Sequence, residues 1–214
     1  ASGDLAPIVD TIYNNALVTL SAYAVEATSR SRSLKPSDGV FAFSSWYGGQ
    51  PIDEFVKGST LYENLRKACR AAKSIAADYG REVELPAIVW VQGETPGVLD
   101  YKTTLEAIAS SIKSDLQSDL ALAQAPEFFV MQTNDSDTSG ALVPAIELSQ
   151  LEASGVTVAG PMYQQPFADN IHGSAIGRMM LADSLSDVLR ILRDTGSFTA
   201  LRPLSATRTG AQVD

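Results

Sequence analysis

The only histidine of this 214-residue chain, His172, lies three residues after Asp169 in the run Asp-Asn-Ile-His. A histidine is the usual general base at neutral pH, and an aspartate is its usual partner because it fixes the tautomer of the imidazole. Any histidine-dependent chemistry of this chain must therefore involve His172. A lone histidine capping a surface helix is the plainer interpretation, so the pair needs support from other segments.

Two other segments carry groups that could stabilise a negative charge on oxygen. Gly48 and Gly49 follow an apolar run, and glycine permits the positive φ that turns a backbone N–H into a crevice. Gln92 follows another apolar run and offers a side-chain amide donor, while Glu94 could orient its neighbours by accepting hydrogen bonds. Each also has a plainer interpretation. The two glycines could form a tight turn, Gln92 could be a polar strand end, and Glu94 could begin a solvated loop.

Apolar runs and helical periodicities alternate along the chain. Strands are predicted at 40–43, 87–91, 128–131 and 156–159, helices at 5–26, 60–79, 99–122, 142–153 and 175–192, and a loop at 28–38. Continuous apolar strands separated by helices are typical of a parallel sheet covered on both faces, so we expect an α/β protein with a three-layer α/β/α sandwich. Ligands of such sheets bind beyond the carboxyl ends of the strands, where all the candidate residues would meet.

Composition narrows the class of protein. The net charge of −9 argues against nucleic acid and anionic membrane surfaces as partners, and no apolar run is long enough to span a bilayer. The single cysteine, Cys69, cannot form an internal disulfide and is predicted to be a packing residue. The run at 135–137 offers too few ligands for calcium, so no metal or cofactor is expected. One domain over 1–195, followed by an exit segment or linker over 196–214, fits the length.

The residue patterns at 48–52 (GGQPI), 90–94 (WVQGE) and 169–172 (DNIH), in this order, resemble the SGNH (GDSL-like) hydrolases. Within them the chain is similar to the carbohydrate-esterase branch that contains sialate O-acetylesterases and acetylxylan esterases. The similarity runs from about residue 40 to residue 192. Gln50 stands where the branch usually has Thr or Ser, and Pro96 stands where an acidic or amide residue is common.

The resemblance implies a flavodoxin-like SGNH fold and removal of O-acetyl groups from a carbohydrate by a Ser-His-Asp mechanism. It makes His172 the base and Asp169 its partner. The amide of Gly49 and the side chain of Gln92 become the oxyanion donors, with Glu94 in support. The implied partner is an acetylated carbohydrate substrate. The sequence leaves the compartment open, with a secreted or surface-associated protein, including a virion component, favoured.

The resemblance does not assign a nucleophile in this sequence. The family's serine stands in a Gly-Asp-Ser or Gly-Gln-Ser-Asn segment after the first, central strand, and this sequence holds no such segment. Ser2 follows no predicted strand, and Ser44 and Ser45 lie too close to the glycines. We therefore expect that the chain lacks the N-terminal part of the domain, so that the serine and its strand lie outside this chain. Either they belong to that missing N-terminal part, or a further polypeptide supplies them to complete the sheet.

Two other functions stay open. One is a catalytically inactive SGNH-fold module that binds glycans or serves in a structural assembly. The other is a general lipase-like acyl hydrolase, for which an aromatic content of only 7% and the lack of an apolar lid segment give little support.

Overall fold

The computed structural model describes residues 49–93, 97–133, 155–162, 164–168 and 173–199, together with 41, 43, 45, 95, 208–209 and 212–213. Within these residues, a parallel sheet is formed by β1 (Ala87–Trp90), β2 (Glu127–Gln132) and β3 (Thr157–Pro161), in the order β1-β2-β3. The register between β2 and β3 shifts between Val130 and Met131. Three of the four predicted strands are therefore confirmed.

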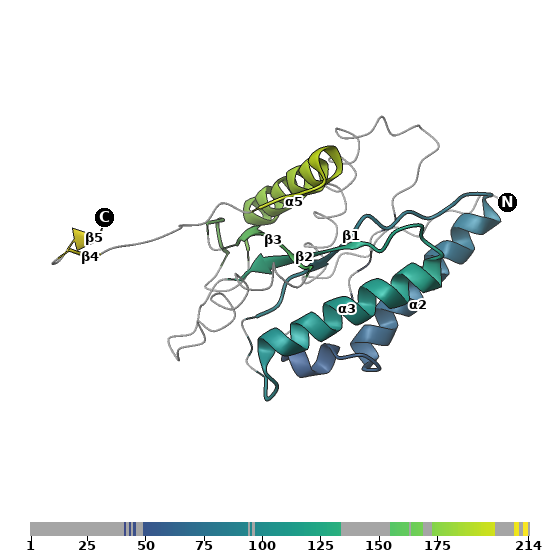
Figure 1. Cartoon of the computed structure of the whole chain (residues 1–214), viewed down its shortest axis with the longest axis horizontal. Coiled ribbons are helices and arrows are strands. Elements are labelled where there is room, and N and C mark those ends of the chain that lie inside the picture. Colours follow the sequence, from purple (N-terminus) through teal and green to yellow (C-terminus); the bar gives the residue numbers. More distant parts are fainter. Residues whose placement is uncertain are drawn as a thin grey trace.

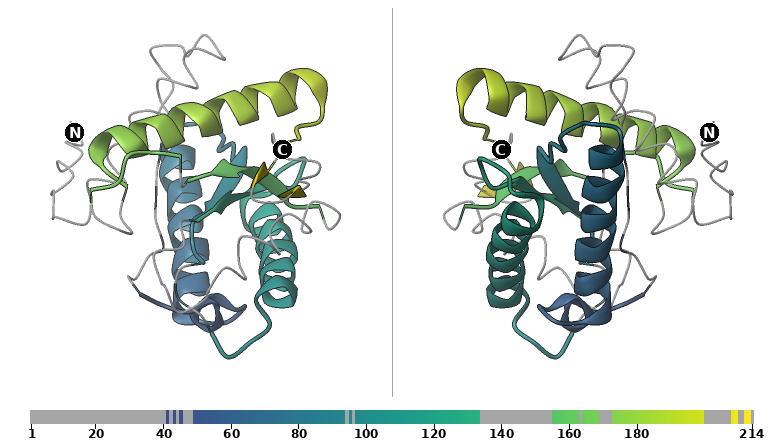
Figure 2. Two further views of the ribbon diagram at one scale, coloured as in Figure 1. Left: turned by 90° about the vertical axis from the view of Figure 1, so that its left-hand side faces the viewer. Right: turned by 90° about the vertical axis from the view of Figure 1, so that its right-hand side faces the viewer.

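Helices cover both faces of this sheet. The short 3-10 helix η1 (Ile52–Phe55) and the helices α2 (Thr60–Asp78) and α3 (Tyr101–Leu120) pack on one face, and α5 (Ala175–Thr195) covers the other. The three layers are visible in Figure 1 and in the two turned views of Figure 2. Parallel neighbours cannot be joined by a tight turn, and the connection from β1 to β2 accordingly crosses a face of the sheet through α3. The predicted α/β sandwich is confirmed.

The core has two halves because successive strand residues point to opposite faces. Phe128 and Val130 face the α2–α3 layer, whereas Phe129 and Met131 face α5, and all four side chains are buried. Cys69 packs, partly buried, against the first of these clusters, as predicted.

The helix ends follow from local signals. Ser59 caps α2 by accepting a hydrogen bond from the backbone N–H of Tyr62, and Gly80 follows the helix with a φ of +64°. Ser174 caps α5, which Gly196 ends in the left-handed conformation. A side chain that accepts an N–H at one end, and a glycine at the other, satisfy backbone groups that the helix leaves unpaired.

The strand predicted at 40–43 is wrong at the residues that can be compared. Phe41 and Phe43 lie in no strand and are 58% and 42% exposed. An apolar run becomes a strand only where a neighbouring backbone pairs with it, and β1 has no partner on its outer side among the described strands. The helices predicted at 5–26 and 142–153 lie outside the described residues.

Three short elements were not predicted. The segment expected to be a linker holds a short antiparallel pair, β4 (Arg208–Thr209) and β5 (Gln212–Val213), and η1 was missed because four residues carry too little periodicity. Of the helices described, none has the length and apolar character to cross a membrane.

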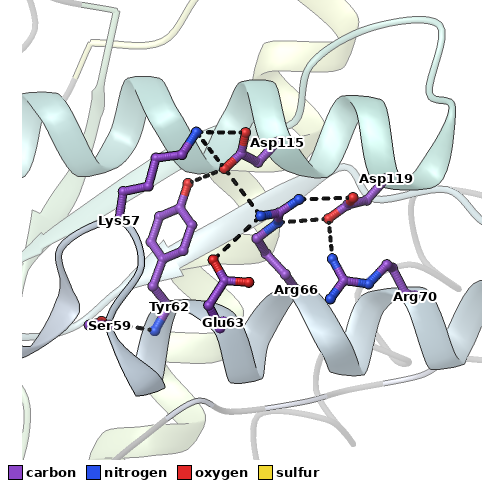
Figure 3. A network of polar contacts seen from close by, with 8 residues as sticks. All are labelled: Lys57, Ser59, Tyr62, Glu63, Arg66, Arg70, Asp115 and Asp119. Atoms are coloured by element: carbon purple, nitrogen blue, oxygen red, sulfur yellow. Dashed lines mark hydrogen bonds and ion pairs between the residues drawn. The ribbon is translucent and has the colours of Figure 1, made fainter.

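A network of charged side chains joins α2 to α3 (Figure 3). Arg66 makes two hydrogen bonds to Asp119, of 2.8 Å from Nε and 3.0 Å from Nη2, and Arg70 adds a third of 3.0 Å. One turn earlier, the Tyr62 hydroxyl donates to Asp115 over 2.7 Å and the Lys57 ammonium lies 2.9 Å from the same carboxylate. Both carboxylates are largely buried, at 17% and 14% exposed.

These contacts lower the pKa of both carboxylates. The hydrogen bonds from Arg66 hold the pKa of Asp119 below its ordinary value. Burial by itself raises the pKa of Asp115, but hydrogen bonds from Lys57 and Tyr62 and the charge of Arg66 outweigh it, so this pKa is also lowered. Burial and the bond to Asp115 raise the pKa of Tyr62, which therefore stays protonated at neutral pH.

Arg66→Met should lower the free energy of unfolding by about 1–2 kcal/mol, between the values typical of exposed and of fully buried ion pairs. Asp119 would keep Arg70 as a partner, so the loss of stability should be smaller than that of a buried charge left without any partner. Arg190→Met is the matched control, because its partner Asp187 is 65% exposed, and it should cost less than about 0.5 kcal/mol. Urea unfolding measures the free energy of unfolding of both variants. Equal losses would contradict the expectation that the Arg66 contacts contribute more to stability than the exposed Arg190 pair.

Acid should weaken the same network. A carboxyl group whose pKa is lowered by folding stabilises the folded state above its unfolded pKa of about 3.9, and this contribution is lost as the pH falls through the folded value. We therefore expect the melting temperature to fall below about pH 4. The fall should be smaller for the double variant Asp115→Asn/Asp119→Asn, and thermal unfolding between neutral and acidic pH checks it. An equal fall in both proteins would show that other groups control acid unfolding.

Candidate active site

Of the predicted site residues, Gly49 and Gln92 are described by the structure, and Gln92 lies at the carboxyl edge of the sheet. Because β1, β2 and β3 are parallel, the segments that follow them emerge at the same edge. The backbone N–H of Met162, just after β3, donates to the carbonyl of Gln132 at the end of β2 over 2.8 Å, so the neighbouring strand ends stay together there. The loop that contains Gln92 follows β1.

Gln92 is placed by the strand before it and the helix after it. Trp90 points into the core, where its ring packs edge-on against Phe55. Its indole N–H donates to the Tyr101 hydroxyl over 3.2 Å, and that hydroxyl donates to the backbone carbonyl of Gln92 over 2.6 Å. This chain of bonds from the buried start of α3 holds the Gln92 backbone in place.

The side chain of Gln92 links the two segments that were predicted to form the oxyanion hole. Its Nε2 donates to the backbone carbonyls of Gln50 and Thr95 over 3.2 and 3.3 Å. Gln50 directly follows Gly49, which is exposed and has a φ of +71°, a conformation that favours glycine. The segments that carry Gly49 and Gln92 are thus brought side by side.

The two ends of the Gln92 amide differ in their hydrogen bonding. Both N–H groups donate to backbone carbonyls, so a bond to a developing oxyanion requires the release of one of them. The Oε1 atom is buried and has no hydrogen-bond partner in the part of the chain that the structure describes. An unpaired buried acceptor costs about 1–3 kcal/mol, so this oxygen is ready to accept a bond from a water molecule or a ligand.

Asp169, His172 and Glu94 lie outside the described residues, as does the run at 135–137. The described residues on either side of Asp169 and His172 contact each other. Phe167 and Gly173 pair as an antiparallel bridge, and the backbone N–H of Ser174 donates to the carbonyl of Pro166 over 2.9 Å. The described residues on the two sides of this segment are therefore close to each other, just before the first turn of α5.

Ser45, one of the serines weighed from the sequence, has its hydroxyl engaged elsewhere. Its Oγ donates to the backbone carbonyl of Leu61, in the first turn of α2, over 2.5 Å. Ser2 and Ser44 lie outside the described residues. Among the described residues, no group of three or more His, Cys, Asp or Glu side chains is placed to hold a metal ion.

Two residues of this edge were missed from the sequence. Tyr101 was placed in a helix but given no role, and Asp53, which bonds to the turn at 97–99, was not singled out. Neither has a spacing that indicates its partner, because both contacts depend on how the chain crosses over the sheet.

A cavity of about 360 Å³ between α3 and the connection from η1 to α2 is lined by other residues, including Val56, Lys57 and Ser111.

Comparison with known protein families identifies the chain. A family described as carbohydrate esterase, sialic acid-specific acetylesterase, matches residues 41–189, well over half of the 214 residues. The chain belongs to this carbohydrate esterase family. Searches of curated proteins and of solved structures found no match.

Membership of this carbohydrate esterase family confirms the resemblance inferred from the three sequence segments. It implies carbohydrate acetylesterase activity in general and an acetylated carbohydrate as the class of substrate. The matched range includes Gly49, Gln92 and Glu94 as well as Asp169 and His172. The roles of these residues stay predictions.

The link made by Gln92 can be tested by Gln92→Glu. The introduced carboxylate cannot donate at neutral pH and would face two carbonyl oxygens, so the free energy of unfolding should fall by at least about 2 kcal/mol. Protonation restores one donor. The introduced group should therefore have a raised folded pKa, and the loss should shrink as the pH is lowered towards about 5.

Urea unfolding at both pH values measures this effect. Gln117→Glu is the matched control, because the Gln117 amide makes only a long 3.5 Å contact to the carbonyl of Leu122. If Gln92→Glu lowers the free energy of unfolding no more than Gln117→Glu does, the link made by the Gln92 side chain is contradicted.

Proposed function

We propose that this protein removes O-acetyl groups from a carbohydrate by a serine-esterase mechanism in which His172 is the general base and Asp169 orients it. Family membership supports the reaction class. The observation that carries the site is the pair of bonds from Gln92 Nε2 to the carbonyls of Gln50 and Thr95. These bonds bring the segments of both proposed oxyanion donors together at the carboxyl edge of the sheet.

The mechanism uses these groups in two steps. The serine Oγ attacks the acetyl carbonyl carbon while His172 takes its proton, and the negative charge on the carbonyl oxygen is stabilised by the Gly49 amide and by Gln92 once one of its N–H groups is released. His172 then returns the proton to the departing sugar hydroxyl. Water attacks the acetyl-enzyme by the reverse sequence and yields acetate.

The serine itself is unassigned, and its expected place outside these 214 residues stays a prediction. A fluorophosphonate that reacts with activated serines, followed by peptide mapping of the protein that shows turnover, would identify it. We expect the label on a segment other than 1–214. A label on Ser2, Ser44 or Ser45 that disappears in His172→Ala would overturn this expectation.

His172→Ala should lower kcat for an O-acetylated sugar by about 10³-fold or more, because the serine then has no base. Acetate release measures turnover, and circular dichroism checks that the fold is intact. Ile176→Ala is the control, since this side chain in the first turn of α5 is 62% exposed. Unchanged turnover in His172→Ala would remove the catalytic assignment, and sugar binding without acetate release by the unmodified protein would favour the inactive glycan-binding alternative.

A further inference from the structure

We propose that Asp53 is a positioning residue of the active site, whose carboxylate fixes the turn at 97–99 and thereby keeps the Thr95 carbonyl in its place against the Gln92 side chain. The role in hydrolysis rests on the proposed function, whereas the clamp itself rests on the contacts described here.

Asp53 joins two parts of the chain that are far apart in sequence. Its Oδ2 accepts a hydrogen bond from the backbone N–H of Val98 over 2.9 Å, and its Oδ1 accepts one from Leu99 over 3.1 Å. These two N–H groups lie just before Asp100, the residue that caps α3, so no helical bond serves them. One carboxylate therefore satisfies two consecutive backbone donors of the turn.

Gly97 allows this close approach. A Cβ atom at residue 97 would collide with Oδ2 of Asp53, and it would lie 3.1 Å from the Cγ atom of that carboxyl group and 3.4 Å from Cγ2 of Ile52. Real Cβ atoms do not tolerate such a contact with a carboxylate that is held in place. The absence of a side chain at Gly97 and the carboxylate at Asp53 are thus complementary parts of one clamp.

Burial holds this turn only in part. Val98 is 95% exposed and gains almost nothing from packing, and Leu99, beside the cavity next to α3, is still 46% exposed. Asp53, by contrast, is held in place because its neighbour Ile52 is fully buried in the core. The two hydrogen bonds therefore transfer the fixed position of η1 to an otherwise weakly held turn.

The clamp is close in sequence to the candidate site, because Thr95 lies two residues before Gly97. The Thr95 carbonyl is one of the two acceptors of Gln92 Nε2. When the turn at 97–99 is released, this carbonyl is free to move and the Gln92 amide loses a fixed partner. Asp53 thus acts on Gln92 indirectly, without contact with a substrate.

Nuclear magnetic resonance of the ¹⁵N-labelled chain tests the clamp without any need for turnover. In Asp53→Ala, the backbone amides of Val98 and Leu99 should exchange with solvent about 10-fold faster or more. The side-chain amide signals of Gln92 should also shift. Gly97→Ala should reproduce both effects with Asp53 unchanged, and Asp53→Asn, which keeps one acceptor oxygen, should release one of the two amides. Glu54→Ala, at the adjacent acidic residue of η1, is the matched control and should do neither.

Unchanged exchange at Val98 and Leu99 in Asp53→Ala would overturn the clamp. Faster exchange with unchanged Gln92 signals would overturn its connection to the site. Should Asp53→Ala fail to fold, Asp53→Asn and Gly97→Ala give the same readouts.

Turnover supplies a separate readout. In the protein that hydrolyses an O-acetylated sugar, Asp53→Ala should lower kcat about 10- to 100-fold, as expected when a catalytic loop is displaced, with KM changed less than about 3-fold. An unchanged kcat together with shifted Gln92 signals would overturn the role in catalysis. Absence of hydrolysis by the unmodified protein would contradict the proposed function alone, and the resonance data would still decide the clamp.

Discussion

Parallel pairing of β1, β2 and β3 constrains the rest of this structure. Two parallel strands cannot be linked by a tight turn, so the chain must return across a face of the sheet before each new strand, and α3 makes this return between β1 and β2. The carboxyl ends of the strands then share one edge. The loop that follows β1, which contains Gln92, emerges there.

Polar contacts serve two different purposes in this fold. On the α2–α3 surface, Arg66, Asp115 and Asp119 hold two helices together and gain stability from paired charges (Figure 3). At the sheet edge, Gln92 and Asp53 instead bond to backbone groups of loops that packing does not hold. The buried Oε1 of Gln92, which has no hydrogen-bond partner among the described residues, lowers stability there. A preorganised site commonly carries such a cost, because its groups are arranged for a ligand.

Acetyl transfer needs a base and fixed donors, and these requirements fall on different parts of the chain. The proposed base, His172, precedes α5 in the sequence, and the proposed donors belong to the segments beside η1 and β1. The two donor segments meet because Gln92 bonds to the carbonyl of Gln50. Tyr101 bonds to the backbone of Gln92 and Asp53 bonds to the turn at 97–99, so both bear on where the proposed donors lie, although neither carries chemistry itself.

The sequence by itself determined the local elements and the type of site. The strands at 87–91, 128–131 and 156–159 and the helices beginning near Thr60 and Ala175 followed from apolar periodicity and from caps, which are local properties, and the segments around Gly49, Gln92 and His172 identified the carbohydrate esterase family. Only the tertiary structure decided that Phe41 and Phe43 form no strand, that both amide protons of Gln92 bond to backbone carbonyls, and that Asp53 holds the turn at 97–99. These outcomes depend on which distant backbone groups come within hydrogen-bond reach, and spacing along a chain carries no record of that distance.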